Sequence, residues 1–386
     1  MTQQTQDKKL CMIPGPIEFH ENVLDAVSTH ATSHVDPRFI NVFGETLENL
    51  REVFAAKNAQ PVVISGSGTL GWDIVASNLA QEGDNVLVLT TGYFGDRFTE
   101  CFQAYKANPT QLKATPGDRP TLEQIEKALS EKEYKILTVT HVDTSTGVVS
   151  DVKAITELVR RVSPNTLVVV DAVCAAVAEE LYFDEWDVDV LLTASQKAIG
   201  VPPGLSILVI SQRALGVYES RTTPVANYYA SLAKWLPIMK AYEARKPSYF
   251  ATPAVQLIYG LNVALKQIIK TGPKAIFEAH KKAAVDFRAH VEGLGLKLVP
   301  VNHEVAANAM TAVWFPEGIT AADFVPHLFG KGVVVAGGLL ADIGPKYFRV
   351  GHMGLSVVEP ERGYVEKTKQ VVAEGLSHFG YKGASQ

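Results

Sequence analysis

The sequence predicts an α/β protein with a doubly wound, mostly parallel sheet in a large domain, followed by a smaller C-terminal α+β domain. Three observations support this fold class. Short β-branched runs alternate with helical patterns through the middle of the chain, which is typical of parallel strands joined by crossover helices. These runs are almost entirely apolar, as expected for strands that are covered on both faces. After about residue 255 one long helical stretch precedes several short strands.

The large domain is expected to contain six buried strands and at least four helices. The strands are expected at Val62–Ile64, Val86–Thr90, Ile136–Thr140, Leu167–Val170, Val190–Thr193 and Leu205–Ile210. Helical spacing of apolar residues predicts the helices at Leu70–Leu79, Asp96–Lys106, Leu122–Leu129 and Val152–Val162. Together these elements predict a doubly wound domain of about 200 residues.

The C-terminal part is expected to begin with helical residues from Val255 to about Leu294, interrupted at Gly272-Pro273. Short strands should follow at Lys297–Pro300, Thr311–Phe315, Val333–Val335 and Phe348–Gly351, and a last helix at about Glu361–His378. We therefore expect a large domain over residues 21–255 and a small domain over residues 256–386. Residues 1–20 should cross between domains, because Ile13–Pro16 is bounded by proline and glycine and cannot form regular structure.

The composition argues against several classes of partner. The chain has 386 residues, a formal net charge of −5, 47% hydrophobic and 20% charged residues, which indicates a soluble globular protein and no nucleic-acid partner. No apolar run approaches the ~18 residues of a membrane span. The three cysteines, Cys11, Cys101 and Cys174, include no CxxC pair and fit a reducing compartment. We saw no signal, transit or SKL-type address (the chain ends Ala384-Ser385-Gln386), so a cytoplasmic location is expected.

The stretch Ser65–Thr69 lies between a predicted strand and a predicted helix start. Its glycines let the backbone approach a ligand, and free N–H groups at a helix start favour an anion. A phosphate cradle and a simple tight turn are the two interpretations. The stretch also spells GxGxxG with Gly71, but a dinucleotide site requires an acidic residue at the end of the next strand. The chain has Thr90-Thr91-Gly92 there instead.

Two other strand ends carry charged residues. Asp171 follows one predicted strand, and Lys197 follows the next. Ligands of open α/β sheets bind at the carboxyl ends of strands, so both residues are expected at one crevice, where a plain ion pair is the simplest outcome. A phosphate cradle, a lysine and a carboxylate are, however, the three groups that pyridoxal phosphate requires. Phe94 lies after a neighbouring strand and is a candidate to stack on the ring.

Other polar and aromatic residues receive structural interpretations. His141 and His352 lie near the predicted crevice, but a structural role is the more frequent one. None of the ten histidines has metal-ligand spacing, so no metal is expected. Tyr228, Tyr229 and Trp235 are expected to pack a core or a dimer interface.

Several strings together resemble the class V aminotransferases of fold type I, and above all the alanine–glyoxylate and serine–pyruvate aminotransferases. The resemblance runs nearly from end to end. The strings that carry it are Ile13–Pro16, Ser65–Thr69, Thr140–Gly147, Asp171–Val173, Thr193–Ala198, Tyr249–Thr252 and Arg349–Gly351. Departures are Thr69 and Phe94, where some relatives carry histidine and tryptophan, and Ser33–Pro37, which receives no role.

The resemblance implies a role for each matching residue. Lys197 would hold pyridoxal phosphate as a Schiff base, and Asp171 would meet the pyridine nitrogen. Residues implied to bind the phosphate are Ser67, Gly68, Thr69 and Gln196 from one subunit and Tyr249 and Thr252 from the other. Phe94 would stack on the ring, and Thr144 would lie beside the phenolic oxygen. Gly15, Thr144 and Arg349 would contact the substrate, with Arg349 as the carboxylate clamp.

The implied enzyme is a homodimer with active sites at the subunit interface, and residues 1–20 extend toward the small domain or the partner. Its expected reaction is transamination between L-alanine and glyoxylate, which yields pyruvate and glycine. Serine–glyoxylate and serine–pyruvate aminotransferases are the alternatives within the family. Outside it, a nicotinamide-dependent oxidoreductase and a non-catalytic protein of the same fold remain open. A cysteine desulfurase is disfavoured, since no cysteine follows Cys174.

Overall fold

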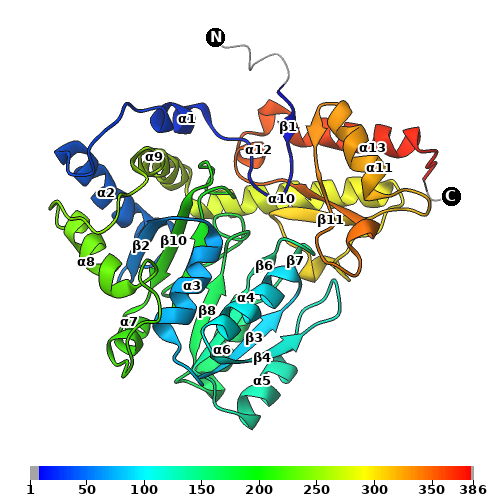
Figure 1. The fold of residues 1–386 in the computed structure, drawn as a ribbon. Coiled ribbons are helices and arrows are strands. Elements are labelled where there is room, and N and C mark those ends of the chain that lie inside the picture. The colour runs from blue at the N-terminus through cyan, green and yellow to red at the C-terminus, as the bar shows by residue number, and fades with distance from the viewer. Residues whose placement is uncertain (1–7, 384–386) are drawn as a thin grey trace.

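The computed structural model describes residues 8–383 and is built around one large sheet (Figure 1). The sheet has seven strands in the order β2-β10-β9-β8-β5-β3-β4. Strand β10 is antiparallel to both of its neighbours, and the other neighbouring strands are parallel. The bounds are β2 Gln60–Ser65, β3 Asn85–Thr90, β4 Asn108–Lys113, β5 Ile136–Thr140, β8 Leu167–Asp171, β9 Val190–Ala194 and β10 Leu205–Ile210. The predicted α/β fold class is confirmed.

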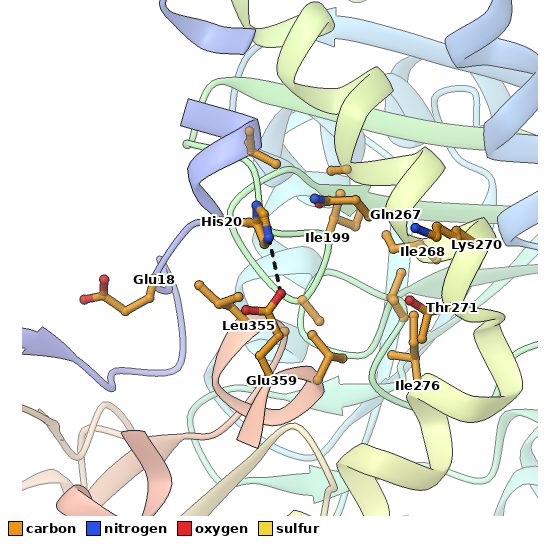
Figure 2. Close-up of a pocket in the computed structure, with 17 residues that line it drawn as sticks. Glu18, His20, Ile199, Gln267, Ile268, Lys270, Thr271, Ile276, Leu355 and Glu359 are labelled. Carbon is orange, nitrogen blue, oxygen red and sulfur yellow. Dashed lines mark ion pairs between the residues drawn. The ribbon is translucent and has the colours of Figure 1, made fainter. Parts of the chain in front are cut away.

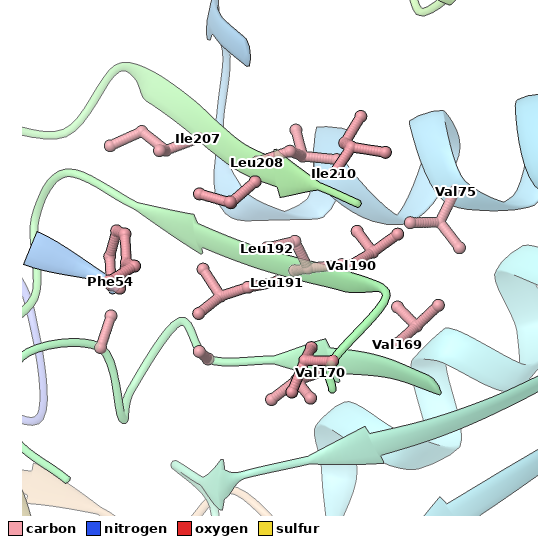
Figure 3. Packing of buried hydrophobic residues seen from close by; sticks show 14 of the residues in the cluster. Phe54, Val75, Val169, Val170, Val190, Leu191, Leu192, Ile207, Leu208 and Ile210 are labelled. Atoms are coloured by element: carbon pink, nitrogen blue, oxygen red, sulfur yellow. The ribbon is translucent and has the colours of Figure 1, made fainter. Parts of the chain in front are cut away.

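The central strands form the core of the molecule. Every residue of β5, β8, β9 and β10 is buried, and Figure 3 shows aliphatic side chains of β8, β9 and β10 packed together with Val75 and Phe54. Strands that are covered on both faces form nearly continuous apolar runs. This pattern made these short strands recognisable in the sequence.

Helices pack against both faces of the sheet. The chain passes from β3 to β4 in one direction and from β4 through β5 to β8 in the other, so right-handed crossovers place α4 on the face opposite α5 and α6. Contacts of α3 with α4, and of α5 with α6, agree with this arrangement. The bounds are α3 Gly68–Leu79, α4 Tyr93–Ala104, α5 Leu122–Glu131, α6 Val152–Val162 and α7 Gln212–Glu219.

A helical layer covers the β2 edge of the sheet. In it α2 packs against α8 and α9, and α1 packs against α9. Their bounds are α1 Glu21–Val27, α2 Pro37–Val53, α8 Leu232–Glu243 and α9 Val255–Thr271.

The C-terminal residues build a second hydrophobic cluster around Phe287, Phe324 and Phe348. It lies between the long helix α10, a three-stranded sheet of order β11-β14-β13, and two outer helices. The bounds are α10 Pro273–Gly293, β11 Met310–Trp314, α11 Ala321–Gly330, β12 Val333–Val334, β13 Ala336–Gly337, β14 Tyr347–Gly351, α12 Leu355–Val358 and α13 Tyr364–His378. The N-terminal strand β1 (Leu10–Cys11) pairs with β12, and the next residues run back to the large sheet.

The structure differs from the sequence-based elements in several places, and helices α1, α2, α7 and α8 were not predicted. Residues Lys297–Pro300 do not form a strand, because only Leu298 bridges to Val313. The last helix begins at Tyr364, and a short 3-10 turn precedes it. Strand β4 was not predicted. The domain bounds at residues 20 and 255 stay predictions. Residues 1–7 of the predicted N-terminal segment and the C-terminal Ala384-Ser385-Gln386 lie outside the described residues. No helix within residues 8–383 is long and apolar enough to cross a membrane.

Candidate active site

A cavity of about 160 Å³ opens at the carboxyl ends of the central strands. Eight predicted site residues line it: Ser67, Gly68, Thr69, Phe94, Thr144, Asp171, Gln196 and Lys197. They come from the ends of β2, β3, β5, β8 and β9, which neighbour one another or share a neighbour in the sheet. The expectation that Asp171 and Lys197 face one crevice therefore agrees with the geometry.

The first wall of the cavity is the N-terminus of α3. Ser67 is the N-cap residue with extended backbone (φ −88°, ψ 171°), and its side chain makes no capping hydrogen bond. The N–H groups of Gly68 and Thr69 lie in the first turn, where no carbonyl four residues back is available within the helix. A Cβ atom on Gly68 would lie 2.8 Å from Val173, so glycine is needed for close packing here. The hydroxyl and the N–H groups together suit an anion.

Asp171, the last residue of β8, presents a buried carboxylate. Its Oδ1 accepts a hydrogen bond from the Val173 N–H at 3.0 Å, and its Oδ2 accepts one from the Trp72 indole at 2.8 Å. Burial raises the pKa of Asp171 to about 6, and these two hydrogen bonds act in the opposite direction. The carboxylate is thus mostly ionised at pH 7 and still has acceptor capacity for a ligand.

Lys197 is also buried, with 7% of its surface exposed. Its Nζ donates to the carbonyl of Pro14, whereas the Asp171 carboxylate accepts from Trp72 and Val173. The ion-pair interpretation is therefore wrong for this structure, because the amine and the carboxylate are each bonded to other groups. Burial lowers the pKa of Lys197, which increases the fraction of neutral, nucleophilic amine. Gly15 (φ +92°) packs directly against this side chain, where a Cβ atom would collide with it.

A buried aspartate, Asp143, holds the N-terminus of α4, which carries Phe94. Asp143 accepts hydrogen bonds from the Phe94 N–H at 3.2 Å and from the Ser145 N–H at 2.9 Å. Ser145 Oγ in turn accepts one from the Tyr93 N–H at 2.9 Å. Phe94 is thereby fixed at the cavity wall, at the edge of the Trp72 ring system (6.4 Å between ring centroids, 67° between planes).

Arg349 on β14 reaches the same place from the C-terminal cluster. Its Nε donates to the carbonyl of Gly337 at 2.8 Å, and its Nη1 donates to the carbonyl of Thr144 at 3.0 Å. Tyr347 on the same strand donates its hydroxyl to the carbonyl of Ser145 at 2.6 Å. These bonds tie β14 to the segment after β5, and they place the guanidinium against Thr144, which lines the cavity, although Arg349 is not itself a lining residue.

Two predicted residues lie away from the cavity of their own chain. Tyr249 is 62% exposed, and its hydroxyl lies 3.4 Å from Thr252 Oγ1. The Tyr249 ring also contacts His34, with 4.9 Å between centroids. An exposed pair of hydroxyls on a loop is compatible with the predicted role in a second subunit, which stays a prediction.

Neither of the two candidate histidines lines the cavity. His352 is buried and its Nε2 lies 2.7 Å from Thr311 Oγ1, while burial lowers its pKa to about 3. His141 is buried beneath the sheet end, and burial lowers its pKa to about 4. Both are neutral residues of the interior, as the structural interpretation expects. Of the aromatic residues expected to pack a core or an interface, Trp235 is buried and Tyr228 is exposed.

A second, larger cavity of about 330 Å³ lies behind the Lys197 loop, between the N-terminal segment, α9 and α12. Figure 2 shows it, with an ion pair between His20 Nε2 and Glu359 Oε1 at 3.3 Å. It contacts Ala198–Gly200 on the far side of the loop. It contains none of the predicted site residues, so the smaller cavity is the better candidate for chemistry.

Sequence reasoning missed three side chains that organise the site: Trp72, Asp143 and Tyr347. Asp143 lies within the Thr140–Gly147 string, and its position at a strand end was a usable signal. Trp72 and Tyr347 gave no signal, because their partners lie 99 and 202 residues away in the chain.

Comparison with known proteins identifies the family. The family model "Aminotransferase class-V" matches residues 8–345. This chain belongs to the class V aminotransferases. It is 43% identical to alanine–glyoxylate aminotransferase 1 of Saccharomyces cerevisiae, over 96% of this chain and 99% of that protein. It is 30% identical to L-aspartate–glyoxylate aminotransferase of Paracoccus denitrificans, over 89% and 85% of the two chains.

Solved structures agree with this assignment. The crystal structure of alanine–glyoxylate aminotransferase from Nostoc sp. superposes with a TM-score of 0.90 and 29% identity, covering 97% of each chain. Class V membership implies pyridoxal phosphate as the cofactor and decides against the nicotinamide alternative, which the missing ribose-binding acid already disfavoured. Within residues 8–383 no cluster of three or more potential metal ligands is present.

Proposed function

We propose that this protein is a pyridoxal-phosphate-dependent aminotransferase that transfers the amino group of L-alanine to glyoxylate, forming pyruvate and glycine. The observation that carries the proposal is the convergence of three groups in one buried cavity: the free N-terminus of α3, the Asp171 carboxylate and the Lys197 amine. Similarity to the yeast alanine–glyoxylate enzyme supports the choice of substrates.

The residues of the cavity fit the cofactor. The uncapped Ser67 hydroxyl, the first N–H groups of α3 and the Gln196 side chain would bind the phosphate. Asp171, which retains acceptor capacity, would bind the protonated ring nitrogen. Phe94 would stack on the ring, and Thr144 would lie beside the phenolic oxygen. Lys197, buried and free of any carboxylate partner, would carry the aldehyde carbon.

When bound, pyridoxal phosphate supplies an electron sink for the charge left at the substrate Cα. The protein supplies the proton transfers. We assign Lys197 Nζ as the base that takes the Cα proton, because its buried environment lowers its pKa and favours the neutral amine. Pro14 holds this amine in place through its carbonyl, and Asp171 keeps the ring nitrogen protonated by remaining ionised.

Arg349 would bind the carboxylate of both the amino acid and the 2-oxo acid. Two of its nitrogens are fixed by carbonyl groups, and no residue among 8–383 accepts a hydrogen bond from Nη2. A planar guanidinium held in this way presents its remaining donors in one orientation, which suits a bidentate carboxylate. Gly15 and Thr144 complete the proposed substrate contacts.

The active form is proposed to be a homodimer in which the partner subunit contributes Tyr249 and Thr252 to each phosphate site. Their exposed hydroxyls on a single-chain surface support this role. The three cysteines are free thiols, which supports a reducing compartment such as the cytoplasm.

Absorption spectroscopy tests the cofactor. The purified protein should be yellow, and its visible band should fall when L-alanine is added and return with glyoxylate. Lys197→Ala should abolish turnover while the protein stays folded, because a buried amine without a carboxylate partner contributes little to stability. A colourless protein that pyridoxal phosphate does not restore would instead support the non-catalytic alternative.

The amino donor is tested separately with glyoxylate as acceptor. Alanine, serine and glycine differ by groups worth only ~1–3 kcal/mol in a pocket, so serine–glyoxylate or serine–pyruvate transamination is the alternative to measure. Ping-pong kinetics with alanine as the best donor would support the proposal. Intersecting initial-rate lines, or a clear preference for serine, would contradict it.

A further inference from the structure

Trp72 makes a hydrogen bond that connects helix α3 to the candidate active site. Its indole N–H donates to Asp171 Oδ2 at 2.8 Å, and both side chains are buried. The N–H is the one polar group of this side chain, and a buried indole N–H requires an acceptor. The Asp171 carboxylate is the acceptor for this N–H.

Aromatic packing fixes the direction of this N–H. The Trp72 ring stacks on Phe98 (5.2 Å between centroids, 14° between planes), and Phe98 stacks on Phe102 (5.0 Å, 15°). The row of rings joins α3 to α4 and leaves the indole little freedom to rotate. Since the Val173 N–H holds Oδ1, the Asp171 carboxylate is held by one donor on each oxygen.

We propose that Trp72 is a positioning residue that orients the Asp171 carboxylate and keeps it ionised for the ring nitrogen of the cofactor. This inference rests on the proposed function, because it requires that Asp171 bind a protonated pyridine nitrogen. It assigns to Trp72 no contact with substrate or reacting atoms. Its effect passes through Asp171 alone.

The electrostatics around Asp171 make this donor important. Burial and the neighbouring Asp143 carboxylate raise the pKa of Asp171, whereas the Val173 N–H, the Trp72 N–H and the Lys197 amine lower it. Two titratable groups act on it by their charge: Asp143, in the short strand β6 (Val142–Asp143) that follows β5, and Lys197, in the loop after β9. Loss of the Trp72 N–H removes a stabilising donor from the ionised form, so a larger fraction of Asp171 becomes protonated near neutral pH.

The experiment compares two cofactors in one set of variants. Pyridoxal phosphate has a ring nitrogen that Asp171 can bind, and 1-deazapyridoxal phosphate has a C–H in its place. The affinities of both are measured on cofactor-depleted full-length protein. The variants are Trp72→Phe and a protein in which Trp72 is replaced by 3-benzothienylalanine, whose sulfur replaces the N–H at nearly constant shape. Phe102→Leu is the control, since it shortens the same row of rings one step away from Trp72 and leaves both the Trp72–Phe98 stack and the indole donor in place.

The measured quantity is the ratio of the two affinities. In the wild type pyridoxal phosphate should bind much more tightly than its deaza analogue. Both Trp72 replacements should reduce this preference about tenfold to a hundredfold, the usual effect of one hydrogen bond to a charged group. Phe102→Leu should change the affinities for both cofactors alike and leave their ratio unchanged.

The outcomes separate this inference from the proposed function. A wild type that binds neither cofactor overturns both. A wild type that prefers pyridoxal phosphate, with the same ratio in the 3-benzothienylalanine protein, overturns only the role of Trp72. This variant also decides the question if Trp72→Phe fails to fold.

Discussion

At the scale of single residues, burial sets the charge state of the candidate active site. It raises the pKa of Asp171 to about 6 and lowers the pKa of Lys197, so it brings both values toward neutrality. Specific donors and acceptors then orient each group: Trp72 and Val173 for the acid, and the Pro14 carbonyl for the amine. An acid and an amine that are held apart in this way remain available for a ligand.

Arg349→Lys should reduce kcat/KM for alanine and glyoxylate by about tenfold to a hundredfold. The substituted ammonium keeps the charge, but it cannot bond the carbonyls of Gly337 and Thr144 and also present a planar fork to a carboxylate. Steady-state kinetics measure the loss, which should appear mainly in KM, and the visible absorption band should persist.

Arg362→Lys is the matched control, because Arg362 pairs with Glu21 and Glu359 outside the cavity. It should leave both kinetic constants unchanged. Equal constants for wild type and Arg349→Lys would remove Arg349 from the proposed substrate site.

Site residues could be predicted where one short string carries both the residue and its chemistry. Lys197 follows a buried strand, and Ser67–Thr69 combine a strand end, glycines and a helix start. Trp72 could not be predicted, because its hydrogen bond joins residues 99 positions apart and depends on how α3 lies on the sheet. For the same reason, the sequence left open whether Asp171 and Lys197 pair with each other.

At the scale of elements, the N-termini of two helices, α5 and α3, serve different purposes. Helix α5 starts with a capping box, in which Thr121 Oγ1 accepts from the Gln124 N–H and Gln124 Oε1 accepts from the Thr121 N–H. Helix α3 starts with Ser67, whose hydroxyl caps nothing. An N-cap serine without a capping bond leaves the helix start open to an anion.

Ser67→Ala should therefore separate cofactor binding from stability. It should lower the affinity for pyridoxal phosphate about tenfold, the value of one hydrogen bond to a charged group. The stability of the cofactor-free protein should change by less than about 0.5 kcal/mol, since no capping bond is lost. Cofactor titration and chemical denaturation measure the two effects.

Thr121→Ala provides the opposite result as a control. It should cost about 0.5–2 kcal/mol of stability by removing a true cap, and cofactor affinity should not change. A large stability loss in Ser67→Ala with normal cofactor affinity would contradict the proposed phosphate site.

The difference between buried and edge strands explains which strands could be predicted from the sequence. The strands β5, β8, β9 and β10 are buried throughout and mostly apolar, whereas β4 is a sheet edge with largely exposed residues and contains Pro109. An edge strand needs no apolar run, so its sequence did not distinguish it from a loop. The segment Lys297–Pro300 looked like a strand because it is apolar, but only one bridge forms there.

At the scale of the whole molecule, a buried carboxyl joins the segment after β8 to the residues just before β11. Glu179 accepts hydrogen bonds from the Asn308 side chain at 2.7 Å and the Ala309 N–H at 3.3 Å, and from the Asn308 N–H. Burial raises its pKa from 4.5 to about 7. The folded protein therefore retains a proton that the unfolded chain releases above pH 4.5, and stability should fall as the pH rises toward 7 and just above.

Glu179→Gln should weaken this pH dependence. One pKa unit corresponds to about 1.4 kcal/mol, so the wild type should lose roughly 3 kcal/mol through this group between pH 4.5 and 8. The variant has no ionisable group at position 179, so its Tm should decline less over that range. Glu180→Gln, at an exposed neighbouring position, is the control and should follow the wild type. Parallel profiles for Glu179→Gln and wild type would contradict the assignment.

The proposed contribution of Tyr249 and Thr252 to the phosphate site of the partner subunit can be tested by complementation. A Lys197→Ala protein lacks the amine, and a Tyr249→Phe/Thr252→Ala protein lacks the exposed hydroxyls. If these hydroxyls serve the partner's site, each mixed dimer contains one site with an intact lysine and intact hydroxyls. Random reassortment of equal amounts makes half of the dimers mixed, so about a quarter of all sites should regain wild-type affinity for pyridoxal phosphate.

If instead the hydroxyls act within their own chain, no mixed dimer has a complete site, and cofactor titration of the mixture should equal the average of the two parents. The exposure of Tyr249, its distance of 3.4 Å from Thr252 and their absence from the cavity of their own chain favour the first result. Recovery of high-affinity sites on mixing would establish that the site is complete only in the dimer, and that the single-chain cavity is one side of it.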